Sequence, residues 1–183
     1  MDGHFVPNLT FGPVVVNALR DKISIPFDIH LMIADPQRYA PHFKVRSDDL
    51  VSFHVEAVSD PIPVIETIQK AGAKAGIALR PKTPLSAVER FLDQIDFLLI
   101  MSVEPGFAGQ SFIAETLEKI RQAKELISKK NLSVAIEVDG GVNAQNIREI
   151  ARAGADIIVA ASAIFGQSDP RAALEQLRSL IIS

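Results

Sequence analysis

Short apolar runs rich in strand-forming residues recur along the chain at a nearly constant interval, and this spacing is the strongest constraint on its fold. Six such runs have starting residues separated by 23, 24, 23, 36 and 23 positions. They are nearly continuous in apolar residues, as expected for strands buried on both faces of a parallel sheet. The predicted strands are residues 27–33, 50–55, 74–79, 97–103, 133–138 and 156–160.

Helical periodicity fills the intervals between these runs. Apolar residues fall on one helical face between positions 64 and 71, between 113 and 127, and between 174 and 181. Asp-Pro pairs at 35–36, 60–61 and 169–170 each place an Asp at a helix N-cap and a Pro at the first helical position. Gly72 and Gly154 stand where two of the helices are predicted to end. This alternation predicts an α/β fold with parallel strands joined by crossover helices.

Two architectures fit that pattern, an open doubly wound sheet and a closed (β/α)₈ barrel. Uniform spacing and polar residues at the strand ends favour the barrel, and no Gly-x-Gly-x-x-Gly motif follows the first strand. A closed barrel needs eight strands, whereas we find six and, at residues 1–6, a strand end with its following loop. We therefore expect residues 1–183 to form a single, incomplete TIM barrel domain that lacks the first strand, the first helix and most of the second strand.

The composition excludes several classes of protein. The 183 residues include 19 Lys and Arg against 22 Asp and Glu, which argues against a general nucleic-acid-binding protein. The absence of cysteine excludes a disulfide scaffold, a thiolate metal site and a Cys nucleophile. No apolar stretch approaches the roughly 20 residues that span a bilayer, and the first residues do not resemble a secretory signal. We expect a cytoplasmic protein with no nucleic-acid or membrane partner; a homo-oligomer stays open.

Polar side chains gather at the predicted carboxyl ends of the strands, where (β/α)₈ barrels place their active sites. Among them His30 and Asp139 offer an imidazole and a carboxylate, which suit Zn²⁺, Mn²⁺ or Fe²⁺. The simpler alternatives are a core histidine for His30 and a turn residue for Asp139. A catalytic metal normally takes three protein ligands, so two ligands fall short. Further polar residues at strand ends, without an assigned role, are His54, Glu56, Arg80 and Lys82.

Glycine-rich segments after the later strands suggest anion binding, because backbone N–H groups there can approach a ligand closely. Counted back from the C-terminus, two of these segments follow the seventh and eighth barrel strands, the frequent phosphate position. The alternative is that the glycines only make tight turns. The candidate phosphate-binding residues are Gly106, Phe107, Ala108, Gly109, Gly140, Gly141, Ala161 and Ser162.

All three methionines of the chain, Met1, Met32 and Met101, also fall at predicted strand ends. Thioether side chains there could form a soft, dry lining above a metal ion. The alternative is ordinary filling of the core, for which methionine is well suited.

Four stretches of the sequence, taken together and in order, closely resemble the motifs of the ribulose-phosphate 3-epimerase family. They are residues 1–8 (MDGHFVPN), 30–32 (HLM), 103–112 (VEPGFAGQSF) and 137–142 (EVDGGV). The resemblance covers essentially the whole chain. It implies a barrel-shaped isomerase of the pentose-phosphate pathway that interconverts D-ribulose 5-phosphate and D-xylulose 5-phosphate with a divalent metal, whether zinc, iron(II) or manganese.

The resemblance also implies a mechanism and roles for particular residues. A proton is removed at C3, and the metal stabilises the resulting enediolate as a Lewis acid. Two aspartates on opposite faces of the sugar act as general base and acid. By resemblance, Asp139 is one of them and also a metal ligand, and His30 is a second ligand that contacts substrate. The three methionines match site-lining residues, and the glycine segments match the substrate- and phosphate-binding segments.

The sequence departs from the family pattern at several points. In the family, a His-x-Asp strand that leads into the Met-Asp-Gly segment supplies two more ligands and the second acid/base. Both are absent here, and Asp2 matches a later residue of that motif. Ala108 and Ala161 stand where the family usually has Gly, and Arg80 and Lys82 replace smaller, more neutral residues.

These departures have two possible explanations. The simpler explanation is a start codon misplaced at an internal Met. If the 183-residue chain is the real product, we expect negligible epimerisation and low stability, because a sheet that does not close exposes unpaired strand edges. Two alternative functions stay open: an epimerase of a related sugar phosphate such as allulose 6-phosphate, and an inactive remnant that binds sugar phosphates.

Overall fold

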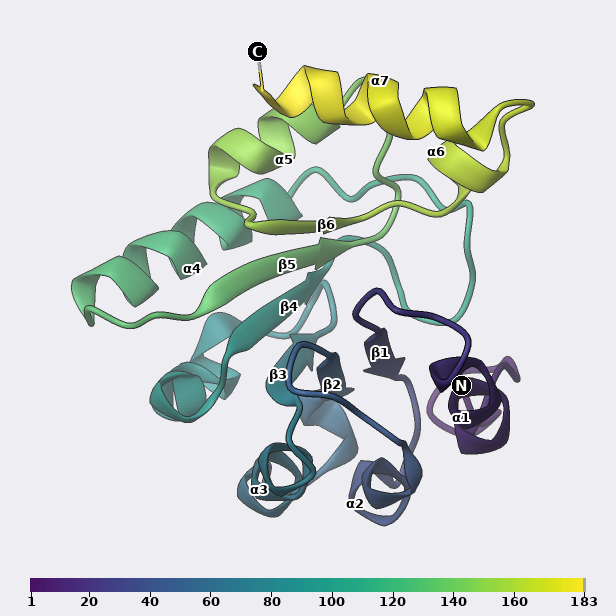
Figure 1. Cartoon of the computed structure of the whole chain (residues 1–183). Helices are drawn as coiled ribbons and strands as arrows, with labels where there is room; N and C mark the ends of the chain where they lie inside the picture. The colour runs from purple at the N-terminus through teal and green to yellow at the C-terminus, as the bar shows by residue number, and fades with distance from the viewer. Residues whose placement is uncertain (183) are drawn as a thin grey trace.

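Six parallel strands, paired in chain order, form one curled sheet with helices along its outer face (Figure 1). This computed structural model of the chain describes residues 1–182. Neither β1 nor β6 has a second strand partner among the described residues, so the sheet is an open arc. The strands are β1 (Asp28–Leu31), β2 (Leu50–His54), β3 (Lys74–Leu79), β4 (Phe97–Met101), β5 (Ala135–Asp139) and β6 (Ile157–Val159).

All six predicted strands are confirmed, and so is the predicted fold class, a partial (β/α)₈ barrel. The boundaries differ by a few residues at most. The most useful difference is in β5, which extends to Asp139 and so makes this residue the last of its strand. The helices are α1 (Pro13–Arg20), α2 (Pro36–Tyr39), α3 (Ile62–Lys70), α4 (Thr116–Lys129), α5 (Ile147–Ala153), α6 (Ser162–Phe165) and α7 (Pro170–Ile182).

Two segments differ from the prediction. Residues 1–6, predicted to begin as a strand end, form a loop whose single ladder contact is an antiparallel bridge between Asp2 and Leu9. Helix α1 follows this loop and was not predicted. Between β3 and β4 the chain uses the 3₁₀ helices η3 (Leu85–Ala87) and η4 (Glu89–Gln94) in place of an α-helix. In the described part of the chain, no helix combines the length and the apolar character needed to cross a membrane.

The predicted helix caps are largely confirmed. Asp35 and Asp169 accept backbone N–H bonds of 3.1 and 3.0 Å from the residues three positions later, as N-cap residues do. The prediction of Asp60 as an N-cap was wrong by one position, because the N-cap of α3 is Pro61. Gly154 ends α5 with a φ of 116°, a left-handed conformation that favours glycine.

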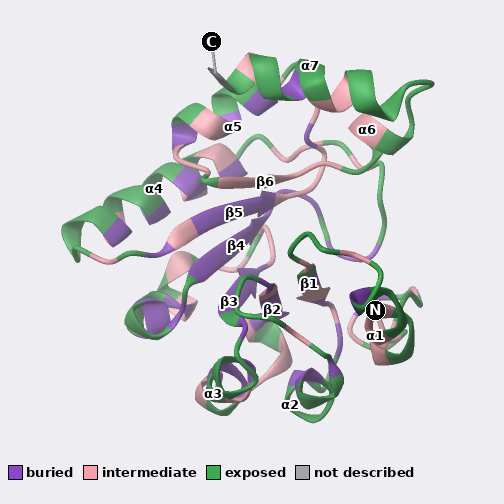
Figure 2. Ribbon diagram, viewed as in Figure 1, coloured by how far each residue is buried: buried purple, intermediate pink, exposed green. Residues whose placement is uncertain are grey.

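Alternate residues of β4 point to opposite faces of the sheet and build two separate cores. Leu98 and Ile100 belong to the large core between the sheet and the helices. Phe97, Leu99 and Met101 belong to a smaller cluster on the concave face. Figure 2 shows β4 and β5 buried, whereas β6, at the open edge, is only partly covered. The concave face is therefore the one on which a site can open.

Three aspartates lock the amino ends of the strands in register. Each directly precedes an even-numbered strand and accepts a backbone N–H from the strand before it. These bonds tie β2 to β1, β4 to β3 and β6 to β5. They run from Phe27 to Asp49 (2.6 Å), from Ala75 to Asp96 (2.8 Å) and from Ile136 to Asp156 (2.9 Å).

Asp49 also anchors helix α1 to the sheet. Its side chain is fully buried and lies 2.9 Å from the guanidinium of Arg20, which is 4% exposed. Its second oxygen accepts the backbone N–H of Arg46 at 2.7 Å. A buried charge pair of this kind is costly to break, because the remaining partner is left without compensation in a medium of low polarity.

We therefore expect Asp49→Ala to lower the free energy of unfolding by about 3–5 kcal/mol, measured by urea denaturation. Asp48→Ala is the matched control, because Asp48 is the neighbouring residue and is exposed. The control should change stability by no more than about 0.5 kcal/mol. Equal effects of the two substitutions would contradict the anchoring role of Asp49.

Candidate functional site

The loops that follow β4, β5 and β6 surround a pocket of about 250 Å³ at the carboxyl ends of these strands. Parallel strands bring their carboxyl ends to one edge, so segments far apart in sequence meet here. The structure brings together around this pocket the predicted methionines, both glycine segments and Asp139. The predicted residues that line it are Met1, Met32, Met101, Gly106, Phe107, Ala108, Gly109, Asp139, Gly140, Gly141, Ala161 and Ser162.

His30 lies beside Asp139, with 3.7 Å between His30 Nδ1 and Asp139 Oδ2. This distance is too long for a hydrogen bond, and Nδ1 is buried without any hydrogen-bond partner. Two metal–ligand bonds of about 2.0–2.2 Å could meet across such a gap. The two side chains thus fit one ion between them. Within residues 1–182 no group of three or more candidate metal ligands is gathered. The candidate metal ligands in the described residues are therefore the pair His30 and Asp139.

The opposite nitrogen of His30 begins a hydrogen-bond chain that is fully buried at His54 and reaches the surface at Glu56. His30 Nε2 lies 2.9 Å from His54 Nε2, and His54 Nδ1 lies 3.1 Å from Glu56 Oε2. The other oxygen of Glu56 accepts the backbone N–H of Arg80 at 2.8 Å and the hydroxyl of Thr83. The chain therefore links the candidate ligand to a carboxylate on the neighbouring strand's end.

The protonation states along this chain follow from burial and hydrogen bonding. Burial lowers the pKa of His54 to about 4, although Glu56 opposes the shift. Burial alone would raise the pKa of Glu56, but hydrogen bonds from His54, Thr83 and the backbone of Arg80 outweigh it and lower the pKa to about 2. At neutral pH His54 is neutral and Glu56 is ionised.

Glu137 is a second acid on the same face of β5, two residues before Asp139. Its side chain is 1% exposed, and its Oε2 has no hydrogen-bond partner. Burial, reinforced by the carboxyl groups of Asp28 and Asp139, raises the pKa of Glu137 to about 10. Glu137 is therefore neutral at pH 7 and lies beneath the pocket rather than in its wall, where Asp139 is the one carboxylate among the described residues.

The turn after Asp139 is held by Ser102, a fully buried residue. The backbone N–H of Ser102 donates to the carbonyl of Asp139 at 2.8 Å. Its hydroxyl lies 3.0 Å from that carbonyl and 2.6 Å from the carbonyl of Gly140. Gly140 has a φ of 124°, and a Cβ there would come within 2.5 Å of Val103. Only glycine fits at this position, so the turn that directly follows Asp139 requires it.

The loop after β4 is braced over the pocket by two amide side chains. Gln110 Nε2 donates to the carbonyls of Glu104 at 2.7 Å and Phe107 at 2.9 Å. Asn8 Nδ2 donates to the carbonyl of Gly106 at 2.9 Å, which joins residues 1–9 to this loop. Both loops are thus part of one rim.

Residues 1–9 are held in place by Asp2 and Arg80. The carboxylate of Asp2 accepts three backbone N–H bonds, from His4, Phe5 and Ala34. Burial alone would raise its pKa, but these bonds prevail and lower it. The guanidinium of Arg80 stacks 4.4 Å from the centre of the Phe5 ring and donates to the Phe5 carbonyl at 3.0 Å. Asp2 and Arg80 are structural here, a role that the sequence did not indicate.

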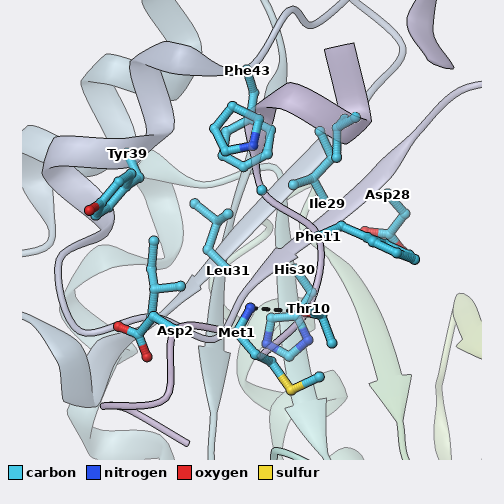
Figure 3. A pocket seen from close by; sticks show the side chains of 14 residues that line it. Met1, Asp2, Thr10, Phe11, Asp28, Ile29, His30, Leu31, Tyr39 and Phe43 are labelled. Atoms are coloured by element: carbon cyan, nitrogen blue, oxygen red, sulfur yellow. Dashed lines mark hydrogen bonds between the residues drawn. The ribbon is translucent and has the colours of Figure 1, made fainter. Parts of the chain in front are cut away.

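A neighbouring pocket of about 390 Å³ opens beside β1 and α1. Figure 3 shows the His30 ring next to Met1 in this pocket. Several other side chains of its wall are apolar, among them Ile29, Leu31 and Phe43. Met1 lines both pockets, so with His30 it forms part of the wall between them.

Besides Arg80 and Lys82, sequence reasoning left three residues near the site without a role: His54, Glu56 and Glu137. His54 and Glu56 were visible as polar residues at a strand end, but their contact with His30 crosses from one strand to the next and has no signature in spacing. Glu137 did have a signal, because an acid two positions before Asp139 in a strand must share its face.

Comparison with known proteins identifies relatives of this chain in sequence and in fold. The profile of the Ribulose-phosphate 3 epimerase family matches residues 1–165. The ribulose-phosphate 3-epimerase of Mycobacterium leprae is 49% identical over 178 residues, which cover 97% of this chain and 80% of that protein. The enzyme of the same name from Bacillus subtilis is 44% identical over 179 residues, 97% of this chain and 82% of that protein.

Solved structures of lower identity share the fold. A crystal structure of KGPDC from Streptococcus mutans superposes with a TM-score of 0.71 at 18% identity, covering 93% of this chain and 79% of that one. Orotidine 5'-phosphate decarboxylase from Pyrococcus horikoshii gives 0.63 at 14% identity, covering 92% and 80%. The fold is thus that of barrel enzymes, and the sequence matches establish that this chain belongs to the ribulose-phosphate 3-epimerase family of isomerases.

Proposed function

We propose that the strand-end pocket binds D-ribulose 5-phosphate and that Asp139 moves the proton at C3 in its interconversion with D-xylulose 5-phosphate. The observation that carries this proposal is the position of Asp139. It is the one carboxylate in the wall of the pocket among the described residues, and it faces His30 across 3.7 Å. A general base must lie within reach of the proton that it takes, and this wall is where the sugar would lie.

The phosphate group would lie against the loops after β5 and β6. Gly140 and Gly141 begin the loop after β5. In the loop after β6, Ala161 is the N-cap of α6, and the first N–H groups of a helix have no partner inside it and can bind a phosphate. Ala161 has a φ of −108°, and Ala108 is not among the described residues with positive φ. Alanine is therefore accommodated at both positions without backbone strain.

The candidate ligands for a divalent ion such as zinc, iron(II) or manganese are His30 and Asp139. When bound, such an ion would act as a Lewis acid on the oxygen atoms next to C3. The protein itself supplies the base at Asp139. Met32 and Met101 present apolar groups that exclude water from the sugar, and Phe107, 56% exposed, lies in the rim where substrate enters.

Inversion at C3 requires a proton to leave from one face and return to the other. Asp139 serves one face. Glu137, the other acid on this face of β5, is neutral, fully buried and outside the pocket wall. In this chain Asp139 would therefore return a proton to the face from which it was taken, so that exchange with solvent outpaces inversion.

The first test measures hydrogen exchange at C3 in D₂O. We expect the chain, supplied with Mn²⁺ and D-ribulose 5-phosphate, to incorporate deuterium at C3 faster than it forms D-xylulose 5-phosphate, as followed by proton NMR. Asp139→Asn should slow this exchange at least about 100-fold, the usual contribution of a general base.

Asp93→Asn is the control, because Asp93 is exposed in η4 and lies outside the strand-end pocket. It should leave the exchange rate unchanged. Exchange that survives Asp139→Asn would contradict the role of Asp139. Formation of D-xylulose 5-phosphate as fast as deuterium exchange at C3 would contradict the proposal that Asp139 acts on one face of the sugar only.

The second test concerns the phosphate end of the pocket. Ser162→Asp would place a carboxylate at the start of α6, where it repels a phosphate. We expect the dissociation constant for D-ribulose 5-phosphate to rise about tenfold or more, equivalent to about 1.4 kcal/mol, as measured by calorimetry. Ser168→Asp, an exposed change before α7 and outside this pocket, should have little effect. Equal weakening by both would place the phosphate elsewhere.

A further inference from the structure

We infer that Glu56 and His54 are positioning residues that fix the tautomer of His30 and leave its Nδ1 unprotonated toward Asp139. This inference rests on the proposed role of His30 as an ion ligand, and it adds how the protein prepares that ligand. The position of each hydrogen atom follows from the hydrogen bonds that join Glu56, His54 and His30.

The first bond joins Glu56 and His54. The Oε1 atom of Glu56 already accepts from the backbone N–H of Arg80 and from Thr83, which fixes the orientation of the carboxylate. Its Oε2 atom lies 3.1 Å from His54 Nδ1. An ionised carboxylate only accepts hydrogen bonds. The hydrogen in this bond therefore belongs to His54 Nδ1.

The second bond joins the two imidazoles. A neutral imidazole with hydrogen on Nδ1 has a lone pair on Nε2. His54 Nε2 lies 2.9 Å from His30 Nε2, and two ring nitrogens at that distance share a single hydrogen. Since His54 has the lone pair, His30 Nε2 must donate.

The third step concerns the free nitrogen of His30. With its hydrogen on Nε2, a neutral His30 has a lone pair on Nδ1. This atom is buried, has no hydrogen-bond partner, and lies 3.7 Å from Asp139 Oδ2. A lone pair aimed beside a carboxylate is what a metal ion requires of an imidazole, and the partner of the opposite nitrogen usually determines it.

The centre of this hydrogen-bond chain, His54, is covered by neighbouring side chains. The side chain of His54 is fully buried, and the Phe5 ring lies 4.8 Å from it, centre to centre. Arg80 in turn stacks on the outer face of Phe5. These two side chains cover His54, the central imidazole of the hydrogen-bond chain, which is where an added water would disturb the tautomers.

The first experiment observes the tautomers directly. The chain has four histidines, His4, His30, His42 and His54, so metal-free protein labelled with ¹⁵N in histidine gives a simple long-range proton–nitrogen NMR spectrum. Single His→Gln variants assign the signals. At pH 7.5 we expect hydrogen on Nδ1 of His54 and on Nε2 of His30. Hydrogen on His54 Nε2, on His30 Nδ1, or on both nitrogens of either ring would overturn the inference.

The second experiment uses Glu56→Gln to reverse the direction of the hydrogen bonds between residue 56, His54 and His30. The new amide keeps an oxygen for Arg80 and Thr83 but turns an N–H₂ donor toward His54 Nδ1. Hydrogen must then move to His54 Nε2 and to His30 Nδ1. We expect both tautomers to switch in the NMR spectrum and the affinity for Zn²⁺ to fall about 10–100-fold, as measured by calorimetry.

Glu66→Gln is the matched control, because Glu66 is 54% exposed on α3 and pairs with Lys70. It should change neither the tautomers nor the affinity for Zn²⁺. Tautomers that stay unchanged in Glu56→Gln would overturn the inference. Tautomers that switch without any loss of Zn²⁺ affinity would support the hydrogen-bond chain but overturn the ligand role of His30, and with it the ion site of the proposed function.

Discussion

Parallel pairing of the strands in chain order is the constraint on which the rest of this structure depends. It sends every strand's carboxyl end to one rim, so that loops from distant parts of the chain enclose one pocket. The clamps made by Asp49, Asp96 and Asp156 set the register at the opposite rim. Register matters because side chains alternate between faces: a slip of one residue would turn His30 or Asp139 toward the helices.

The sequence was sufficient for the strands because strands buried on both faces are continuous apolar runs, and their spacing reports the crossovers. It was insufficient for α1, which opens with Pro13 and three valines. β-Branched residues are weak helix formers, and this helix is held by a tertiary contact, the ion pair of Arg20 with Asp49. The 3₁₀ helices between β3 and β4 were not predicted for a related reason. In η4 the buried residues are Phe91 and Leu92, so tertiary packing rather than a helical pattern in the sequence holds this segment.

For the site, motifs in the sequence pointed to His30, Asp139 and the glycine segments. The structure gathers Asp139 and the glycine segments around one pocket and brings His30 beside Asp139. What the motifs could not show is how these side chains are controlled. The contact of His54 with His30 depends on the curl of the sheet between β1 and β2. The turn that begins at Asp139 is held through its backbone by Ser102, which follows the neighbouring strand β4 and is far from Asp139 in the sequence.

The two acids of β5 show how strongly position in this sheet determines chemistry. Glu137 and Asp139 share a face, yet burial holds Glu137 neutral while Asp139 reaches the pocket. With a folded pKa near 10, well above its usual 4.5, Glu137 favours the folded state fully only below pH 4.5, and this contribution is lost as pH rises toward 10. At neutral pH its burial therefore opposes folding. The gain is electrostatic: the strand contributes one negative charge to the pocket in place of two.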